Sequence, residues 1–206
     1  MSIAPTNPQS PNWHDEIPSL PIWRFTVEEY HEMIDSGILR SGTPIELLEG
    51  WLVRKMIKKP PHELSTGCIC DILAELVGPE WHVRNQGPIT TDDSEPEPDV
   101  SVARGSRRDY VDRHPSPSDI AIVIEVADTS LDHDRGQKKR IYATSRILVY
   151  WIVNLQDRCV EVYTKPTASA ERPEYADQHV YQSGDRISVF LDEVEVGQLA
   201  VDDLLP

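Results

Sequence analysis

The strongest constraint on the fold is the nearly continuous apolar run over residues 120–126, in which Glu125 is the single charged side chain. A strand that is apolar on both faces is typical of the centre of a sheet that is covered on both sides. The chain has 206 residues, 39% of them hydrophobic, and this is enough to bury such a sheet in one domain. The sequence therefore predicts a single globular domain built around this strand.

Hydrophobic periodicity and turn residues place further helices and strands around the central strand. The clearest signals are a capping box from Thr26 to Glu29, which begins a helix, and a hairpin turn at Glu49-Gly50. In chain order, the predicted elements are a helix over 26–37, a hairpin over 45–53, a helix over 63–77, strands over 81–84, 98–102 and 120–126, a helix from 134 to about 146, paired strands over 148–153 and 159–163, and a last strand over 187–190.

Three local expectations follow from this assignment. The helix over 63–77 should bury Leu64, Cys68, Ile72 and Leu76 on one face, with His62 at its start. Asp134 should lie near the cap of the later helix, with Ile141 and Tyr142 turned inward, and residues 164–179 should be a polar connection. Five prolines in residues 1–21 predict a flexible tail, so that the domain spans 22–206.

Charge and composition exclude several classes of protein. A net charge of −15 is unsuited to a passive nucleic-acid coat, although thirteen of the twenty Lys and Arg residues fall within 54–59, 104–113 and 135–146. These windows form either a local basic face or separate solvated positions. The sequence lacks a run of about 20 apolar residues, and three cysteines cannot all pair within one chain. We therefore expect a cytoplasmic protein with reduced thiols and no membrane association.

Two acidic residues are candidates for chemistry. An ionised carboxylate inside an apolar strand, such as Glu125, costs several kcal/mol unless it is paired, protonated or bound to a metal. Asp99, directly after Pro98, begins a neighbouring strand. Two such carboxylates can hold Mg²⁺ or Mn²⁺, and Lys138 on the following helix can neutralise a phosphoryl oxygen or orient water. Alternatively, backbone donors or Arg satisfy the carboxylates, and Lys138 is a solvated helix residue.

A longer series of short motifs along the chain is specific through its order and spacing. The series consists of residues 25–30, residues 46–50, His62, Pro98-Asp99, residues 124–126, residues 128–130, residues 135–138, Tyr142-Ala143, residues 150–153 and residues 160–163. Together these motifs resemble the Uma-two family of restriction-type endonucleases, a branch of the PD-(D/E)XK phosphodiesterase superfamily, from about residue 25 to the C-terminal end. The resemblance implies an α/β (α+β) fold with a restriction-endonuclease-like core, in which helices flank a mixed β-sheet. It also implies a metal site and a homodimer.

The resemblance assigns roles to individual acidic residues. Asp99 and Glu125 match the two acidic motif positions, which makes them the leading ligands for Mg²⁺ or Mn²⁺. Glu46 matches the acidic residue on an early element that completes many such sites, and a hairpin charge facing water is the alternative. His62 is a further possible site residue, although a local hydrogen bond at a helix start is the simpler role.

The lysine position departs from the pattern of the wider superfamily. Ala127 stands two residues after Glu125, where the lysine of the superfamily motif would be. In the Uma-two pattern the lysine is displaced to the next helix, and Lys138, four residues before Tyr142, matches it. Lys139 is adjacent, and the sequence leaves open which of the two side chains points inward.

The function that the resemblance implies is a metal-dependent endonuclease that hydrolyses DNA. One alternative is a non-catalytic nucleic-acid or protein-binding module on a degenerate nuclease fold, which the net charge of −15 and Ala127 favour. A second alternative is a hydrolase of another phosphodiester, which would keep the metal without affinity for DNA.

Overall fold

The computed structural model describes residues 21–40, 42–167 and 172–206, so the predicted tail lies outside the described residues except for Pro21. The helices are α1 (Val27–Asp35), α2 (Pro60–Leu76), α3 (Leu131–His133) and α4 (Lys139–Thr144), with a π-helical turn η4 (Asp134–Lys138) and short 3₁₀ turns η2 (Arg107–Tyr110), η3 (Pro117–Asp119) and η5 (Val201–Asp203). The strands are β1 (Ile45–Leu48), β2 (Trp51–Arg54), β3 (Trp81–Asn85), β4 (Val100–Arg104), β5 (Ile120–Ala127), β6 (Val149–Asn154), β7 (Cys159–Pro166), β8 (Tyr175–Gln182), β9 (Arg186–Leu191) and β10 (Val194–Ala200).

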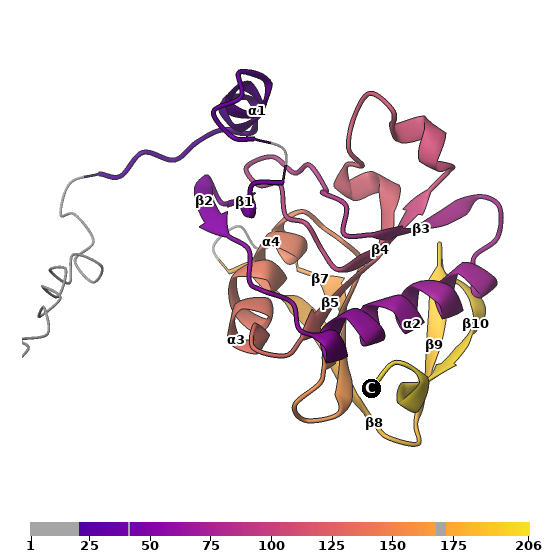
Figure 1. The fold of residues 1–206 in the computed structure, drawn as a ribbon. Helices are drawn as coiled ribbons and strands as arrows, with labels where there is room; N and C mark the ends of the chain where they lie inside the picture. The colour runs from indigo at the N-terminus through magenta and orange to yellow at the C-terminus, as the bar shows by residue number, and fades with distance from the viewer. Residues whose placement is uncertain (1–20, 41, 168–171) are drawn as a thin grey trace, which may run out of the picture.

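A six-stranded mixed sheet in the order β3-β4-β5-β6-β7-β8 forms the centre of the molecule (Figure 1). β5 pairs antiparallel with β4 and parallel with β6, and every residue of β5 is buried. The crossover between the parallel strands β5 and β6 passes through α3, η4 and α4. The predicted central strand and the predicted mixed sheet flanked by helices are therefore confirmed.

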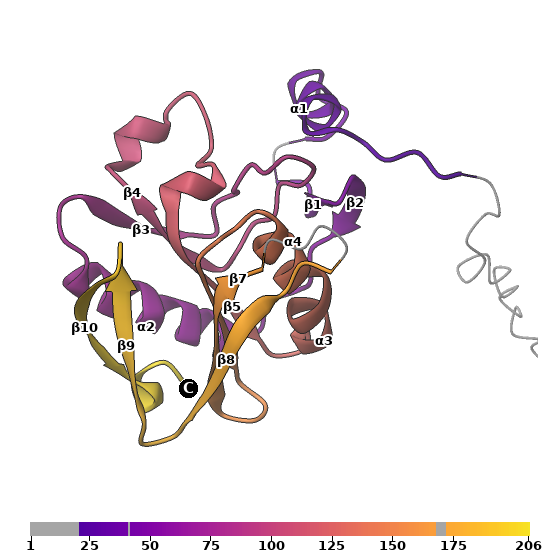
Figure 2. The same cartoon turned by 180° about the vertical axis from the view of Figure 1, so that it is seen from behind.

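Alternate residues of β5 enter two different hydrophobic cores on the two faces of the sheet. Ile122, Ile124 and Val126 pack in the core that contains residues of α2 and of the β9–β10 hairpin. Val123 and Ala127 pack in the opposite core, with residues of α4 (Figures 1 and 2). Because side chains alternate along a strand, Glu125 points to the α4 side. This alternation decides which helix meets the buried carboxylate.

The expected buried face of α2 is wrong. The helix begins at Pro60, and it buries His62, Ser65, Thr66, Ile69 and Leu73. Leu64 is 56% exposed, and Cys68, Ile72 and Leu76 are only partly buried. The polar side chains on the buried face have hydrogen-bond partners. The Ser65 hydroxyl donates to the carbonyl oxygen of Leu204 at 2.6 Å, and the Thr66 hydroxyl donates to the carbonyl oxygen of His62 at 2.9 Å. Apolar spacing alone did not anticipate a buried face that is partly polar.

The expectations for the later helix and for residues 164–179 are partly wrong. Helical structure begins at Leu131, and Asp134 lies inside it instead of at its cap, although Ile141 and Tyr142 are buried as expected. β7 extends to Pro166, and β8 begins at Tyr175, which is buried and donates its hydroxyl to the carbonyl oxygen of Ile147 at 2.9 Å. A single buried tyrosine thus anchors an edge strand that is otherwise largely polar.

The N-terminal elements agree with the sequence. The capping box is present at the start of α1, where the backbone N–H of Glu29 donates to the Thr26 hydroxyl and the Glu29 carboxylate accepts from the backbone N–H of Thr26. β1 and β2 form a separate two-stranded hairpin that turns at Glu49-Gly50. Among the described helices, none is long and apolar enough to cross a membrane.

Candidate metal and phosphate site

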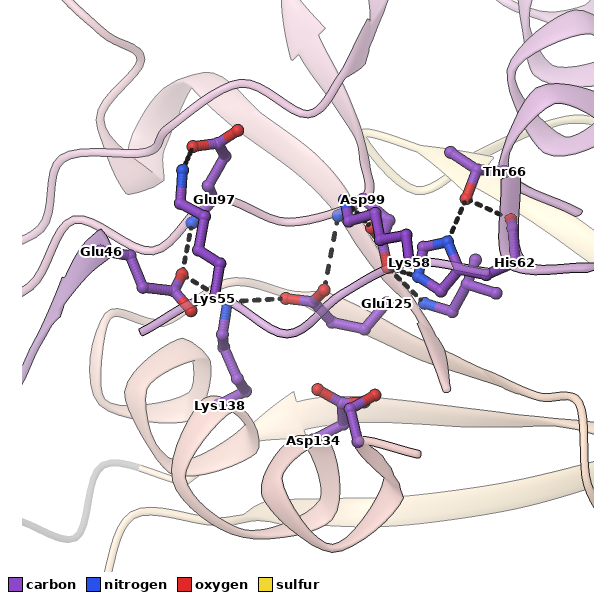
Figure 3. Close-up of polar contacts among 12 residues, drawn as sticks. Glu46, Lys55, Lys58, His62, Thr66, Glu97, Asp99, Glu125, Asp134 and Lys138 are labelled. Atoms are coloured by element: carbon purple, nitrogen blue, oxygen red, sulfur yellow. Dashed lines mark hydrogen bonds and ion pairs between the residues drawn. The ribbon is translucent and has the colours of Figure 1, made fainter. Parts of the chain in front are cut away.

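The pairing of β4 with β5 brings Asp99 and Glu125 together at one end of the sheet. Val100 pairs with Ile124, so Asp99 is next to Glu125 across the strands. The backbone N–H of Asp99 donates to Glu125 Oε2 at 3.4 Å, and the backbone N–H of Val126 donates to Asp99 Oδ2 at 2.8 Å. Both side chains are buried. The two carboxylates that the sequence indicated therefore share one site (Figure 3).

Glu125 is held by groups from the helical crossover. The Tyr142 hydroxyl donates to Glu125 Oε1 at 2.6 Å, and the Lys138 ammonium lies 3.3 Å from the same oxygen. Burial raises the pKa of Glu125 to about 8, with a further increase from the charge of Asp99, although Lys138 and the Tyr142 hydroxyl act in the opposite direction. Glu125 therefore retains a proton more readily than a solvated glutamate.

The π-helical turn η4 delivers Lys138 into the buried site. Its ammonium donates to Glu46 Oε2 at 2.8 Å, and the backbone N–H of Glu97 donates to the same oxygen at 3.0 Å. Burial alone would lower the pKa of Lys138, but the carboxylates of Glu125 and Glu46 outweigh it and raise the pKa overall. Lys138 therefore carries its charge inside the protein, and Glu46 anchors it from the β1–β2 hairpin.

Lys139 points away from this site. Its ammonium lies 2.9 Å from Glu174 Oε2 and 5.2 Å from the centre of the Tyr163 ring. The sequence left open which of the two lysines turns inward, and the structure places Lys138 there.

Asp99 is surrounded by donors and cations. His62 Nε2 lies 3.1 Å from Asp99 Oδ2, and the Lys58 ammonium donates to Asp99 Oδ1 at 2.7 Å. Burial would raise the pKa of Asp99, but the hydrogen bond from His62 and the charge of Lys58 hold that pKa below its usual value. His62 thus reaches the site from the first turn of α2. The Nδ1 atom of His62 lies 3.4 Å from Thr66 Oγ1, four residues later in the same helix.

These groups line a cavity of about 150 Å³. Its acidic lining residues are Glu46, Glu97, Asp99, Glu125, Asp128 and Asp134. Residues 54–59, which join β2 to α2 and which we call the basic segment, contribute Arg54, Lys55, Lys58 and Lys59 to the same lining. A buried acidic centre is therefore bordered by cations, although the chain as a whole is strongly acidic.

A family model described as "Putative restriction endonuclease", named Uma2, matches residues 27–201. The chain belongs to the Uma2 family. A solved structure titled as a putative nuclease belonging to DUF820, from Anabaena variabilis, is similar to the chain with a TM-score of 0.62 and 20% sequence identity. That similarity covers 89% of this chain and 97% of the other, and at this identity it supports the shared fold. A search of curated proteins finds no significant match.

The donor chemistry of this Uma2 site suits a hard divalent cation, because Asp99 and Glu125 offer carboxylate oxygens in one cavity. The oxygens are occupied by Lys58, Lys138, His62, Tyr142 and backbone donors. Among the described residues, no three or more His, Cys, Asp or Glu side chains are grouped so as to hold a metal ion. Glu46 contacts Lys138, so its role as a third ligand stays a prediction.

Sequence reasoning missed two members of this Uma2 site, Asp134 and Lys58. Asp134 lines the cavity, and burial raises its pKa to about 6, although the Ser130 hydroxyl donates to its carboxylate at 2.5 Å and acts in the opposite direction. Its spacing of four residues from Lys138 was an available signal, because residues at this spacing share one face of a helix. Lys58 had no comparable signal, since its contact with Asp99 depends on the path of the basic segment.

Proposed function

We propose that this Uma2 protein is a metal-dependent endonuclease that hydrolyses DNA phosphodiester bonds. The observation that carries the proposal is the convergence of Asp99, Glu125 and Lys138 in one cavity bordered by the basic segment. Buried acids beside a buried ammonium suit a substrate whose reacting group is an anion that also binds a divalent cation. Membership of a family described as "Putative restriction endonuclease" supports the same reaction class.

Each residue has a distinct role in the proposed reaction. Asp99 and Glu125 hold Mg²⁺ or Mn²⁺, which when bound supplies Lewis-acid stabilisation of phosphate oxygens and a more acidic water. Lys138 donates to a phosphoryl oxygen, where it stabilises developing negative charge, or orients the attacking water. Tyr142 fixes the orientation of Glu125, and His62 fixes that of Asp99.

Cleavage assays test this proposal. Supercoiled, linear duplex and single-stranded DNA are incubated with purified protein, with Mg²⁺, with Mn²⁺ and with a chelator. We expect cleavage of at least one substrate only with the ion, and a loss on the order of 10²-fold or more in Asp99→Asn, Glu125→Gln and Lys138→Ala, as for other groups that stabilise a transition state. Lys139→Ala is the matched control and should retain the parental rate. Ion-independent cleavage, or full activity in Asp99→Asn, contradicts the proposal.

A second candidate is a non-catalytic binding module on the nuclease fold. The observation that favours it is that Lys58 and Lys138 already pair with Asp99 and Glu125, so the acids are balanced by protein cations. Calorimetric titration with Mn²⁺ separates the two candidates, because the module has no need of a divalent site. Mn²⁺ binding that is lost in Glu125→Ala supports the endonuclease, and its absence in the parent protein supports the module.

The remaining expectations about partners are also proposals. Binding to DNA that weakens as salt rises, measured with a labelled duplex, separates a DNA hydrolase from a hydrolase of another phosphodiester. The homodimer that the family resemblance implies is checked by sedimentation equilibrium, where a monomer across the accessible concentration range would exclude it.

A further inference from the structure

Lys58 occupies the oxygen of Asp99 that a divalent cation needs. The other oxygen, Oδ2, accepts the backbone N–H of Val126 at 2.8 Å and lies 3.1 Å from His62 Nε2. Oδ1 instead accepts from the Lys58 ammonium at 2.7 Å, and Figure 3 shows this contact on the side of Asp99 away from Lys138. A cation that binds Oδ1 therefore requires the Lys58 ammonium to leave.

The basic segment is built in a way that permits this movement. It has no regular secondary structure from Lys55 to Lys59, and its two apolar side chains, Met56 and Ile57, are 49% and 87% exposed. Within the described part of the chain, residues 56–58 make no backbone–backbone hydrogen bond. A segment with few buried contacts and a solvated backbone opens at low cost in free energy.

Lys58 differs in this respect from Lys138. The Lys138 side chain is 5% exposed and contacts both Glu46 and Glu125. The Lys58 side chain is 30% exposed and makes its ion pair with Asp99 alone among the described residues. Lys58 can therefore exchange the carboxylate for solvent or for another anion, whereas moving Lys138 would leave buried charges unpaired.

The two other lysines of the basic segment, Lys55 and Lys59, also pair with carboxylates of the site. Lys55 pairs with Glu97, and Lys59 lies 3.0 Å from Asp128, and both acids line the cavity. Three lysines of one short segment are thus engaged with acids of the site. While they remain so, their charges are less available to an external phosphate.

We propose that Lys58 is a tethered counter-ion that competes with the divalent cation for Asp99 and, once released, binds the phosphate backbone of the nucleic acid. This inference rests on the proposed function and concerns its regulation. Binding of the cation and binding of DNA then favour each other, and by linkage each increases the affinity of the other by the same factor. The protein thereby gains a phosphate-binding ammonium, in addition to that of Lys138, when the cation is in place.

Metal affinity measured by calorimetry tests the first half of the proposal without reference to catalysis. Mn²⁺ is titrated into the parent protein and into Lys58→Gln, Lys58→Arg and Lys59→Gln. We expect Lys58→Gln to bind Mn²⁺ tighter by roughly fivefold or more, a typical size for coupling between sites. Lys58→Arg should behave like the parent, and Lys59→Gln, which removes the same charge from the same segment, should change the affinity much less.

The outcomes of this titration are distinct. Equal Mn²⁺ affinity in the parent and in Lys58→Gln overturns the competition, and so does an equal gain in Lys59→Gln, because the effect would then be general electrostatics. Circular dichroism and thermal unfolding check that each variant is folded. If Lys58→Gln binds Mn²⁺ tighter while no DNA is cleaved under any condition, the counter-ion role is supported and the proposed nuclease activity is contradicted.

DNA binding tests the second half of the proposal. Anisotropy of a labelled duplex is measured with and without Ca²⁺, which prefers the same oxygen ligands. We expect Ca²⁺ to tighten DNA binding by the parent protein severalfold more than binding by Lys58→Gln. The same factor in both proteins overturns the transfer of Lys58 from Asp99 to phosphate.

Discussion

Tyr142 supports the site at the scale of a single residue, because its hydroxyl donates to the buried carboxyl of Glu125 at 2.6 Å. Replacing Tyr142 by Phe keeps the ring but removes this donor from a fully buried position. At a pH above about 8, where Glu125 is ionised, we expect Tyr142→Phe to lower the free energy of unfolding by about 1.5–3 kcal/mol, the range for hydrogen bonds to charged groups. Urea unfolding followed by fluorescence measures the change.

Tyr150→Phe is the matched control for this prediction. Tyr150 is equally buried, and its ring lies 5.0 Å from that of Tyr142, but its hydroxyl donates to the neutral backbone carbonyl of Asp134 at 3.1 Å. The expected cost is about 0.5–1.5 kcal/mol. If Tyr142→Phe lowers the free energy of unfolding no more than Tyr150→Phe does, the hydrogen bond to Glu125 is no stronger than the bond to a neutral carbonyl, and the prediction is wrong.

Single residues differ in how far the sequence could predict them. Asp99 and Glu125 stood out because acidic residues among buried strands need compensation. The structure does compensate them, with two ammonium groups together with side-chain and backbone hydrogen-bond donors, and the sequence did not show which groups these are. Lys58 reaches Asp99 across 41 sequence positions, and a contact of that kind depends on the path of the chain and leaves no local pattern.

At the scale of elements, two glycines have opposite conformational roles. Gly67 lies inside α2, and a Cβ added there meets no atom within 4 Å. Gly50 turns the β1–β2 hairpin with a φ of +78°, and a Cβ there would lie 2.6 Å from Cβ of Arg24. We expect Gly67→Ala to raise the free energy of unfolding by roughly 0.5–1 kcal/mol and Gly50→Ala to lower it by roughly 1–2 kcal/mol. Urea unfolding measures both, and a shift of the same sign in both variants would contradict this assignment.

The short turn η3, which leads into β5, has a stability that depends on pH. The hydrogen bond from Arg113 to Asp119, with those from Ser116, lowers the pKa of Asp119 to about 2, although burial acts in the opposite direction. Because this pKa in the folded state is below the unfolded value, the ionised carboxylate stabilises the fold above about pH 4, and the effect is lost as pH falls toward 2. The difference in stability between the parent and Asp119→Asn should therefore be present at pH 6 and shrink toward pH 2. A difference that does not vary with pH, in urea unfolding at several pH values, would contradict this.

Elements with a regular pattern were predictable, and those set by tertiary contacts were not. β5, the hairpin and α1 follow directly from apolar runs, a turn pair and a capping box. The rotation of α2 was missed because its buried face carries polar residues. Ser65 finds its partner, the carbonyl oxygen of Leu204, only in the folded chain, whereas the Thr66 hydroxyl donates to the carbonyl oxygen of His62 within the helix. β8 was missed because a polar edge strand is stabilised by its pairing with β7.

For the molecule as a whole, a net charge of −15 would oppose the binding of DNA, while the proposed endonuclease would attract DNA locally through the basic segment. Binding should therefore depend on a few contacts that are sensitive to salt. We expect Arg54→Gln to reduce the slope of log K against log salt by about 0.9, which is the loss of one phosphate contact. Arg186→Gln, on β9 and outside the cavity lining, removes the same charge and should leave the slope unchanged. The same slope in the parent protein, in Arg54→Gln and in Arg186→Gln would show that DNA does not contact the basic segment at Arg54.

The site is divided between two sheets, and this division has a consequence for partly unfolded forms of the protein. Glu125 belongs to β5 of the large sheet and Asp99 directly precedes β4 of the same sheet. Glu46 belongs to the β1–β2 hairpin and is joined to Glu125 through Lys138. If the hairpin detaches, the ammonium loses one of its two carboxylate anchors while the acidic pair stays assembled. Fraying at the N-terminal edge would therefore loosen the hold on Lys138 before it disperses the acidic pair.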